Sequence, residues 1–204
     1  MGVSAQARVG VLGGTFDPPH LAHLVLAAAA RRVLRLDRVV LVPAGDPWRK
    51  ADRAVTQAQT RLRLVEAAAA ALPWAEVSAI EVDRAGPTYT LDTFEELATA
   101  EPDAAWWFLL GEDALADLPH WHEPERLVER VRFGLAQRTG AEPAAATLEA
   151  LPGLAGRVDL VPMPALDVSA SELRRRVARG DPTTPLLPGA VRALIDELGL
   201  YRGE

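Results

Sequence analysis

The stretch "RVGVLGGTFDPPHLAHLVLAAAA", residues 8–30, decides the fold. Residues 8–12 form a short apolar run typical of a buried strand. Residues 21–36 read as a helix that ends in arginines, which are favourable at a helix C-terminus. Between them, residues 13–23 hold two glycines, two prolines and two histidines. A strand, a glycine turn and a helix in this order predict the first unit of an α/β protein.

The same alternation continues along the chain. We expect further strands at 38–43, 75–82, 105–111, 132–136 and 157–163. We expect further helices at 56–72, with Thr56 as N-cap, at 90–100, with Thr90 as N-cap, and near 169–179 and 188–198. This pattern predicts an α/β fold: a Rossmann-like, doubly wound parallel sheet with helices on both faces. We expect one domain over 1–204, with a helical C-terminal part from about 165, and a variable surface excursion at 139–156.

Composition narrows the class of protein. The chain has 204 residues and a formal net charge of −6. It has no cysteine, and the absence of cysteine excludes disulfides, thiol nucleophiles and thiolate metal sites. An acidic chain is poorly suited to non-specific nucleic-acid binding, and its apolar runs are too short to span a bilayer. No signal-peptide pattern precedes the first strand. We therefore expect a cytoplasmic protein that binds neither nucleic acid nor membranes.

The loops after three strands carry the informative residues. In a parallel sheet these loops meet beyond the carboxyl ends of the strands, where ligands bind. They read "GGTFDPPH", "PAGDPWRK" and "GEDALADLPHW". We expect them to share one cleft.

The glycine turn favours an anion. Gly13 and Gly14 let the backbone approach a ligand, and the helix that follows points free N–H groups into the same space. His20 and His23 share one helical face and can donate to phosphate oxygens. Metal ligation and a purely structural helix end remain alternatives for the two rings, although a metal would need a third ligand. The turn matches neither GxxxxGK[ST] nor GxGxxG.

A second anion site is predicted near the other end of the chain. Ser169 and Glu172 form the S-x-x-E pattern of a capping box. A helix that is simply well capped is one interpretation. On this motif alone the capped helix is the favoured interpretation, but a helix start that carries Ser169, Ser171 and Arg174 can also hold a polyphosphate.

Together these segments resemble a known family. "GGTFDPPHLAH" is similar to the GGTFDPxHxGH signature of nucleotidyltransferases with the (T/H)xGH motif, and "VSASELR" is similar to their ISSTxIR motif. "GPTYTLDTFEEL", "FLLGEDALADLPHW" and the final "LGLY" resemble segments of the nicotinate mononucleotide adenylyltransferases. The resemblance runs in order from about residue 8 to residue 201.

The resemblance implies a reaction in NAD biosynthesis. ATP and nicotinate mononucleotide would give deamido-NAD and pyrophosphate, with Mg²⁺. The mononucleotide's own phosphate would be the nucleophile, so no protein base or covalent nucleophile is needed. ATP and nicotinate mononucleotide are then the expected partners, and a homo-oligomer is left open.

The resemblance also implies roles for residues. His20, His23 and Arg174 would be catalytic. ATP would contact Gly13, Gly14, Thr15, Phe16, His20, His23, Gly111, Asp113, Ser169, Ser171 and Arg174. The mononucleotide would contact Lys50, Thr90, Asp113 and Trp121, with Trp121 stacking on the pyridine ring. No metal-ligating side chain is expected.

Two positions depart from the family pattern. Ala22 replaces the glycine of HxGH, and Ala170 replaces the second serine of ISSTxIR. Neither change removes a charge, so we expect activity to survive. The alternatives are an adenylyltransferase for nicotinamide mononucleotide or phosphopantetheine, and a nucleotide-binding sensor without turnover. The related HIGH-type aminoacyl-tRNA synthetases fit less well, because this chain is short and has no evident tRNA-binding domain.

Overall fold

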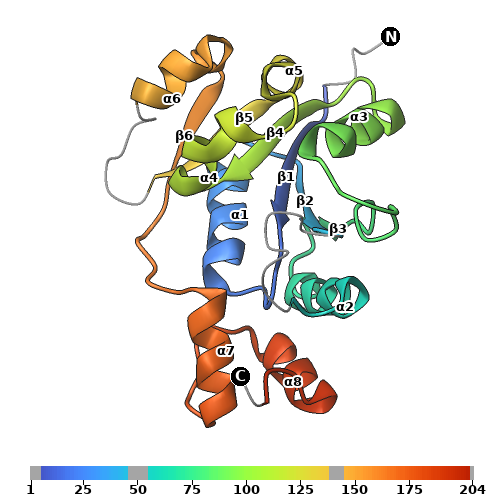
Figure 1. The fold of residues 1–204 in the computed structure, drawn as a ribbon, viewed down its shortest axis with the longest axis vertical. Coiled ribbons are helices and arrows are strands. Elements are labelled where there is room, and N and C mark those ends of the chain that lie inside the picture. The colour runs from blue at the N-terminus through green and yellow to red at the C-terminus, as the bar shows by residue number, and fades with distance from the viewer. Residues whose placement is uncertain (1–5, 46–54, 138–144, 203–204) are drawn as a thin grey trace.

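The fold is a parallel sheet of six strands, seen in a computed structural model that describes residues 6–45, 55–137 and 145–202 (Figure 1). The strands are β1 (Arg8–Gly14), β2 (Arg38–Pro43), β3 (Ala75–Val77), β4 (Ala105–Leu110), β5 (Arg132–Gln137) and β6 (Val158–Pro162). Their order across the sheet is β3-β2-β1-β4-β5-β6, and every pairing is parallel. The chain therefore reverses direction across the sheet between β1 and β4, which is where such sheets bind ligands. The predicted doubly wound α/β fold is confirmed.

Helices cover both faces of the sheet, as the continuous apolar strands require (Figure 1). The longer helices are α1 (Leu21–Val33), α2 (Ala58–Ala69), α3 (Thr90–Ala100), α7 (Ala170–Arg179) and α8 (Gly189–Leu198). The shorter ones are α4 (Glu112–Asp117), α5 (Pro124–Arg130) and α6 (Ala145–Ala150). α3 and α5 bury side chains against one face of the sheet, where Phe108 and Phe133 lie. α1 packs on the opposite face, against Leu41 and Leu109.

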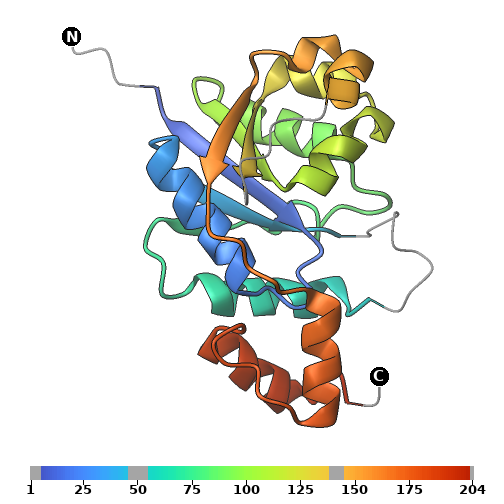
Figure 2. The same cartoon turned by 90° about the vertical axis from the view of Figure 1, so that its left-hand side faces the viewer.

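The C-terminal helices α7 and α8 lie together at one end of the molecule, below α1 and α2 (Figure 1, Figure 2). They share a separate apolar cluster with α2, in which Leu64, Leu173, Val191 and Ile195 are fully buried. The Leu21 amide at the start of α1 also donates to the Leu186 carbonyl at 2.9 Å. The helical C-terminal part is thus packed against the elements that carry the first motif.

Several sequence predictions need correction. The strand predicted at 75–82 ends at Val77, because the chain turns away from the sheet after the Ser78 amide bonds to Leu41. Thr56 is not the cap of α2, which follows Gln57, and Thr90 is the first residue of α3, which follows Tyr89. The described part of the excursion expected at 139–156 lies mostly at the surface, but it contains α6 and a short 3₁₀ turn (Pro152–Leu154), and Leu154 is buried. The helices α4, α5 and α6 are not among the predicted elements.

The capping role of Ser169 is confirmed. Ser169 precedes α7, and its side-chain oxygen accepts a hydrogen bond from the Glu172 amide at 3.2 Å. Glu172 does not complete a capping box in the hydrogen bonds that the structure describes; its carboxylate instead pairs with Arg175 and Arg176. These arginines lower the pKa of Glu172.

Replacing Ser169 with alanine should remove this cap. We expect the free energy of unfolding to fall by about 1 kcal/mol, because one amide at the start of α7 loses its acceptor. Urea denaturation followed by circular dichroism measures the change. Ser169→Asp is the matched control: a carboxylate also caps, so this variant should remain within a few tenths of a kcal/mol of the parent. Equal stability of the alanine variant and the parent would contradict the capping role.

Candidate active site

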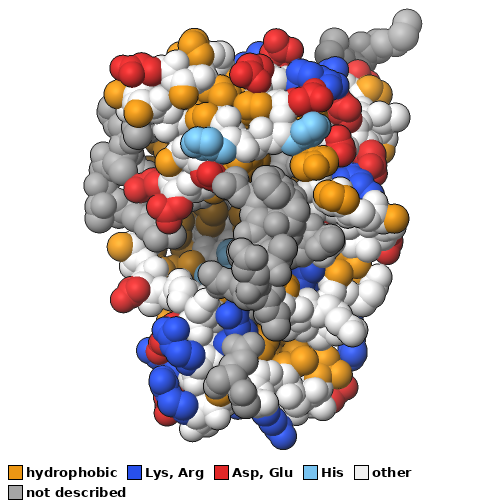
Figure 3. Space-filling view, viewed as in Figure 1, with side chains coloured by type: hydrophobic (Ala, Val, Ile, Leu, Met, Phe, Trp, Pro, Cys, Tyr) orange, Lys and Arg blue, Asp and Glu red, His pale blue; other side chains and the backbone are white. Residues whose placement is uncertain are grey.

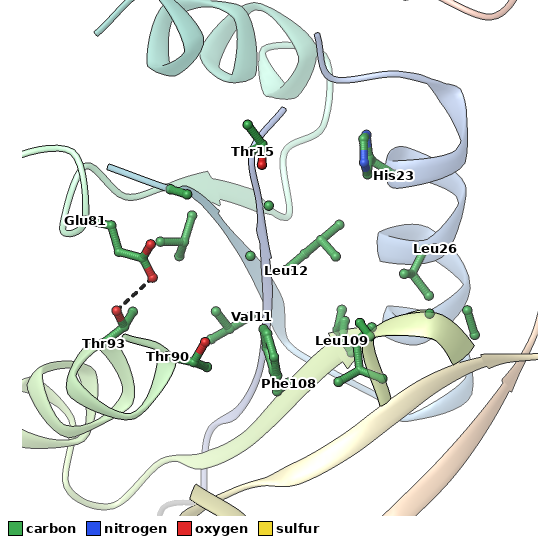
Figure 4. A pocket seen from close by; sticks show the side chains of 18 of the residues that line it. Val11, Leu12, Thr15, His23, Leu26, Glu81, Thr90, Thr93, Phe108 and Leu109 are labelled. Carbon is green, nitrogen blue, oxygen red and sulfur yellow. Dashed lines mark hydrogen bonds between the residues drawn. The ribbon is translucent and has the colours of Figure 1, made fainter. Parts of the chain in front are cut away.

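A cavity of about 500 Å³ opens at the carboxyl ends of β1 and β4, between α1 and α3 (Figure 3, Figure 4). Side chains from both ends of the chain reach it. The predicted site residues that line it are Gly13, Gly14, Thr15, His20, His23, Thr90, Gly111 and Trp121. The expected meeting of the loops after β1 and β4 is therefore confirmed, and Ala44 extends the lining to the loop after β2.

The remaining predicted residues lie elsewhere. Phe16, Asp113, Ser169, Ser171 and Arg174 are not among the lining residues, although Val168, just before Ser169, is. Asp113 is exposed at the start of α4. Lys50 lies outside the described residues.

Phe16 packs against two of the residues that line the cavity, Gly14 and His23. Its backbone is left-handed, with φ of 50°, and its side chain is buried. The ring lies under Gly14, where a Cβ atom would stand 3.2 Å from the ring. It also meets the His23 ring edge-on, with 4.9 Å between the ring centroids. Phe16 thus packs against the glycine turn and the histidine rather than forming the cavity wall.

The two histidines form one unit at the start of α1. The His20 amide donates to Nδ1 of His23 at 3.1 Å, and the two rings stack with centroids 3.8 Å apart. An accepting Nδ1 carries no hydrogen, so the proton of a neutral His23 ring is on Nε2. Figure 4 shows the ring on the cavity side of α1. In a neutral His23 ring, Nε2 is therefore the nitrogen that carries a proton to donate.

The second motif reaches the first through Arg174. One guanidinium nitrogen of Arg174, on α7, donates to the Asp17 backbone carbonyl at 2.9 Å. Asp17 lies in the loop between Gly14 and His20, so residues 157 positions apart in sequence meet at the loop that joins β1 to α1. Ala22 lines the cavity from within α1, where a helix accommodates alanine well. Ala170 is the first residue of α7.

The other side of the cavity is aromatic. The Trp121 ring packs edge-on against Phe108, with centroids 5.8 Å apart, and its N–H donates to Asp117 at 3.1 Å. Tyr89 stacks on His122 with centroids 4.2 Å apart. A flat apolar ring suits this side, because aromatic faces and edges complement one another. The sequence prediction missed His122 as a lining residue.

Glu81 is a second lining residue that the sequence prediction missed. Its carboxylate accepts a hydrogen bond from the Thr93 hydroxyl at 2.8 Å (Figure 4). Burial raises the pKa of Glu81. The signal for this residue was an acid in the apolar run "AIEV", which was assigned to a strand.

A buried arginine holds the loops that frame the cavity. Arg61, on α2, is 1% exposed and donates to three carbonyls: Thr56 at 2.7 Å, Thr15 at 2.8 Å and Gly45 at 2.8 Å. Burial lowers the pKa of Arg61, and the nearby Asp17 charge opposes this shift. Gly45 has no room for a side chain, since a Cβ atom would lie 2.0 Å from the Glu81 carbonyl oxygen. The sequence prediction did not single out Arg61.

None of the helices described is long and apolar enough to cross a membrane. Within 6–45, 55–137 and 145–202, no group of three or more histidine, aspartate or glutamate side chains could hold a metal ion.

Comparison with known proteins agrees with this geometry. A family model described as cytidylyltransferase-like matches residues 11–176. A protein of Streptomyces coelicolor with the name "Probable nicotinate-nucleotide adenylyltransferase" is 44% identical over 193 residues, which is 95% of this chain and 100% of that protein. A protein of Thermomicrobium roseum with the same name is 42% identical over 198 residues, covering 97% of this chain and 92% of that protein.

Solved structures show the same fold. The "Plasmodium falciparum nicotinic acid mononucleotide adenylyltransferase complexed with NaAD" has a TM-score of 0.79 and 19% identity, covering 98% of this chain and 99% of that one. At this identity the likeness concerns the fold alone, whereas the curated relatives match in sequence along nearly their whole length. The chain therefore belongs to the cytidylyltransferase-like family and, with its full-length relatives, to the nicotinate-nucleotide adenylyltransferases.

Proposed function

We propose that this chain transfers the adenylyl group of ATP to nicotinate mononucleotide, giving deamido-NAD and pyrophosphate in NAD biosynthesis. One observation carries the proposal: a single cavity has the stacked histidines at one side and the aromatic Trp121 side at the other. The names of the full-length relatives support this reaction. The titles of two Plasmodium falciparum structures, complexes with NaAD and with APC, support it further.

The chemistry needs alignment rather than a protein nucleophile. A phosphate oxygen of the mononucleotide forms a bond to the α-phosphorus of ATP. The bond between that phosphorus and the oxygen that bridges the α- and β-phosphates breaks. Pyrophosphate leaves with that oxygen and its electron pair. Negative charge gathers on the phosphoryl oxygens, so fixed donors at that point lower the barrier. His23 is such a donor, because its Nδ1 already accepts the His20 amide.

The assignments of the remaining residues follow the resemblance. We assign catalytic roles to His20, His23 and Arg174. The ATP site would also include the glycine turn, Gly111 after β4, Asp113 in the first turn of α4, and Ser169 and Ser171 at the start of α7. The mononucleotide site would include Thr90, Asp113, Trp121 and, from outside the described residues, Lys50.

Mg²⁺ is the expected metal. It would neutralise charge on the triphosphate as the pyrophosphate departs. Mg²⁺ is commonly held by substrate phosphates rather than by an all-protein cage. The described residues fit this arrangement, since the glycine turn and the start of α1 present donors for the substrate phosphates at the cavity. The use of ATP as a substrate favours a cytoplasmic location. We also propose that residues 1–204 form one nucleotidyltransferase domain.

Pyrophosphate release tests the function directly. The purified protein with ATP and Mg²⁺ should release pyrophosphate with nicotinate mononucleotide and far less with phosphopantetheine. Nicotinamide mononucleotide, assayed in parallel, measures the preference between acid and amide. Chelation of Mg²⁺ should stop the release. A folded protein that binds ATP and releases no pyrophosphate with any of the three acceptors would instead be a nucleotide-binding sensor.

A further inference from the structure

Asp17 is a buried residue near the N-terminus that accepts hydrogen bonds from residues near the C-terminus. We call Asp17 and its hydrogen-bond partners Tyr201, Thr56 and Arg174 the junction. One of its carboxylate oxygens accepts a hydrogen bond from the Tyr201 hydroxyl at 2.7 Å, and the other accepts one from the Thr56 amide at 3.2 Å. Its backbone carbonyl accepts the bond from Arg174 at 2.9 Å. A single residue of the first motif thus contacts α7, the segment after α8 and the segment before α2.

The junction is closed to solvent. Asp17 is 6% exposed and Tyr201 is 8% exposed. Burial and the neighbouring Asp17 carboxylate raise the pKa of Tyr201, so its hydroxyl keeps its proton at neutral pH and remains a donor. A buried carboxylate needs such donors, because it has left its hydration shell. The Tyr201 hydroxyl therefore helps to fix the orientation of Asp17.

The orientation of Asp17 bears on two groups of the site. Its carbonyl oxygen holds the guanidinium of Arg174. Three residues later along the same loop, His20 begins the stacked histidine pair. A rotation of Asp17 would displace both the arginine and the loop that leads to the histidines.

We infer that Tyr201 is a positioning residue for ATP: through Asp17 it holds the β1–α1 loop and Arg174 in the geometry that binds the triphosphate. This inference rests on the proposed function. Tyr201 is buried and is not among the residues that line the cavity, so we assign it no direct contact with the substrate. Its expected influence is on ATP rather than on the mononucleotide, since the aromatic side of the cavity is built from other elements, α3 and the segment 118–122.

A purely structural role for Tyr201 is the competing explanation. The Tyr201 ring belongs to the apolar cluster that joins α2, α7 and α8. Tyr201→Phe keeps that ring and removes only the hydroxyl. Ile195→Val is the matched control: Ile195 is fully buried in the same cluster, and the variant removes one methyl group without touching a polar group of the junction.

The experiment measures KM for each substrate, kcat and the thermal midpoint of all three proteins. We expect Tyr201→Phe to raise KM for ATP by about tenfold, the usual scale for losing one hydrogen bond to a charged group. KM for nicotinate mononucleotide and kcat at saturating ATP should change less than about threefold, within the range of a lost indirect contact. Ile195→Val should lower the thermal midpoint and leave both KM values unchanged.

Two results would overturn the inference. One is an unchanged KM for ATP in Tyr201→Phe; the other is an equal rise in Ile195→Val, which would assign the effect to loosened packing. If the unsubstituted protein releases no pyrophosphate, the proposed function fails separately. Calorimetric titration with a non-hydrolysable ATP analogue then tests the positioning role, with weaker binding by Tyr201→Phe as the supporting result and equal binding as the opposing one.

Discussion

Replacing His23 with alanine is expected to lower kcat by about 10²–10³-fold, the usual cost of removing one fixed donor to a transition-state oxyanion. The physical reason is the fixed tautomer. Because Nδ1 of His23 accepts the His20 amide at 3.1 Å, Nε2 carries the proton of the neutral ring, and under the proposed function it donates to the phosphoryl oxygens. Steady-state pyrophosphate release at saturating ATP and nicotinate mononucleotide measures the effect.

Asparagine at this position separates the catalytic role of His23 from its hydrogen bond with the His20 amide. In His23→Asn the side-chain oxygen can still accept the His20 amide, and the shorter side chain does not carry its amide N–H group to the position of Nε2. This variant should lose about as much turnover as the alanine variant while retaining more stability. His120→Ala controls for the loss of a histidine, since His120 is exposed and does not line the cavity. Turnover close to that of the parent in His23→Asn would contradict the role of Nε2.

Replacing Arg61 with methionine is expected to lower the free energy of unfolding by about 3–5 kcal/mol. Methionine fills a similar space but donates nothing. The carbonyls of Thr15, Gly45 and Thr56 would each lose a charged donor in a site that is 1% exposed. The Asp17 carboxylate would also lose a neighbouring positive charge. Urea denaturation measures the change.

Arg63→Ala is the matched control for Arg61→Met. Arg63 lies two residues further along α2, its side chain is half exposed, and it is 3.9 Å from Glu197. A surface pair of this kind contributes little, so this variant should lie within about 0.5 kcal/mol of the parent. Arg61→Lys should be intermediate, because one ammonium group cannot reach three diverging carbonyls. Equal stability of Arg61→Met and Arg63→Ala would show that the three hydrogen bonds contribute nothing.

Local patterns predicted most of the fold. The apolar runs of β1, β2 and β4 are buried on both faces of the sheet, so the runs themselves reveal strands. The incorrect predictions concern segments whose secondary structure or burial depends on contacts with residues distant in the sequence. Residues 78–82 have strand-like composition, but the chain leaves the sheet after Val77 and places Glu81 beside Thr93. Within the mostly exposed segment 145–156, Leu154 is buried against the core of β5 and its neighbours, which nothing local in that segment shows.

The sequence by itself determined the alternation of strands and helices, the two phosphate-type motifs, and the capping of α7 by Ser169. These features depend on residues that are close together in the chain. The spacing of such residues is enough to predict their local structure. Only the tertiary structure decided that Arg61 would hold three loops, and that Asp17 would join Tyr201 and Arg174 across more than 150 positions. Those contacts depend on which strands become neighbours, and the strand order follows from the packing of the whole chain.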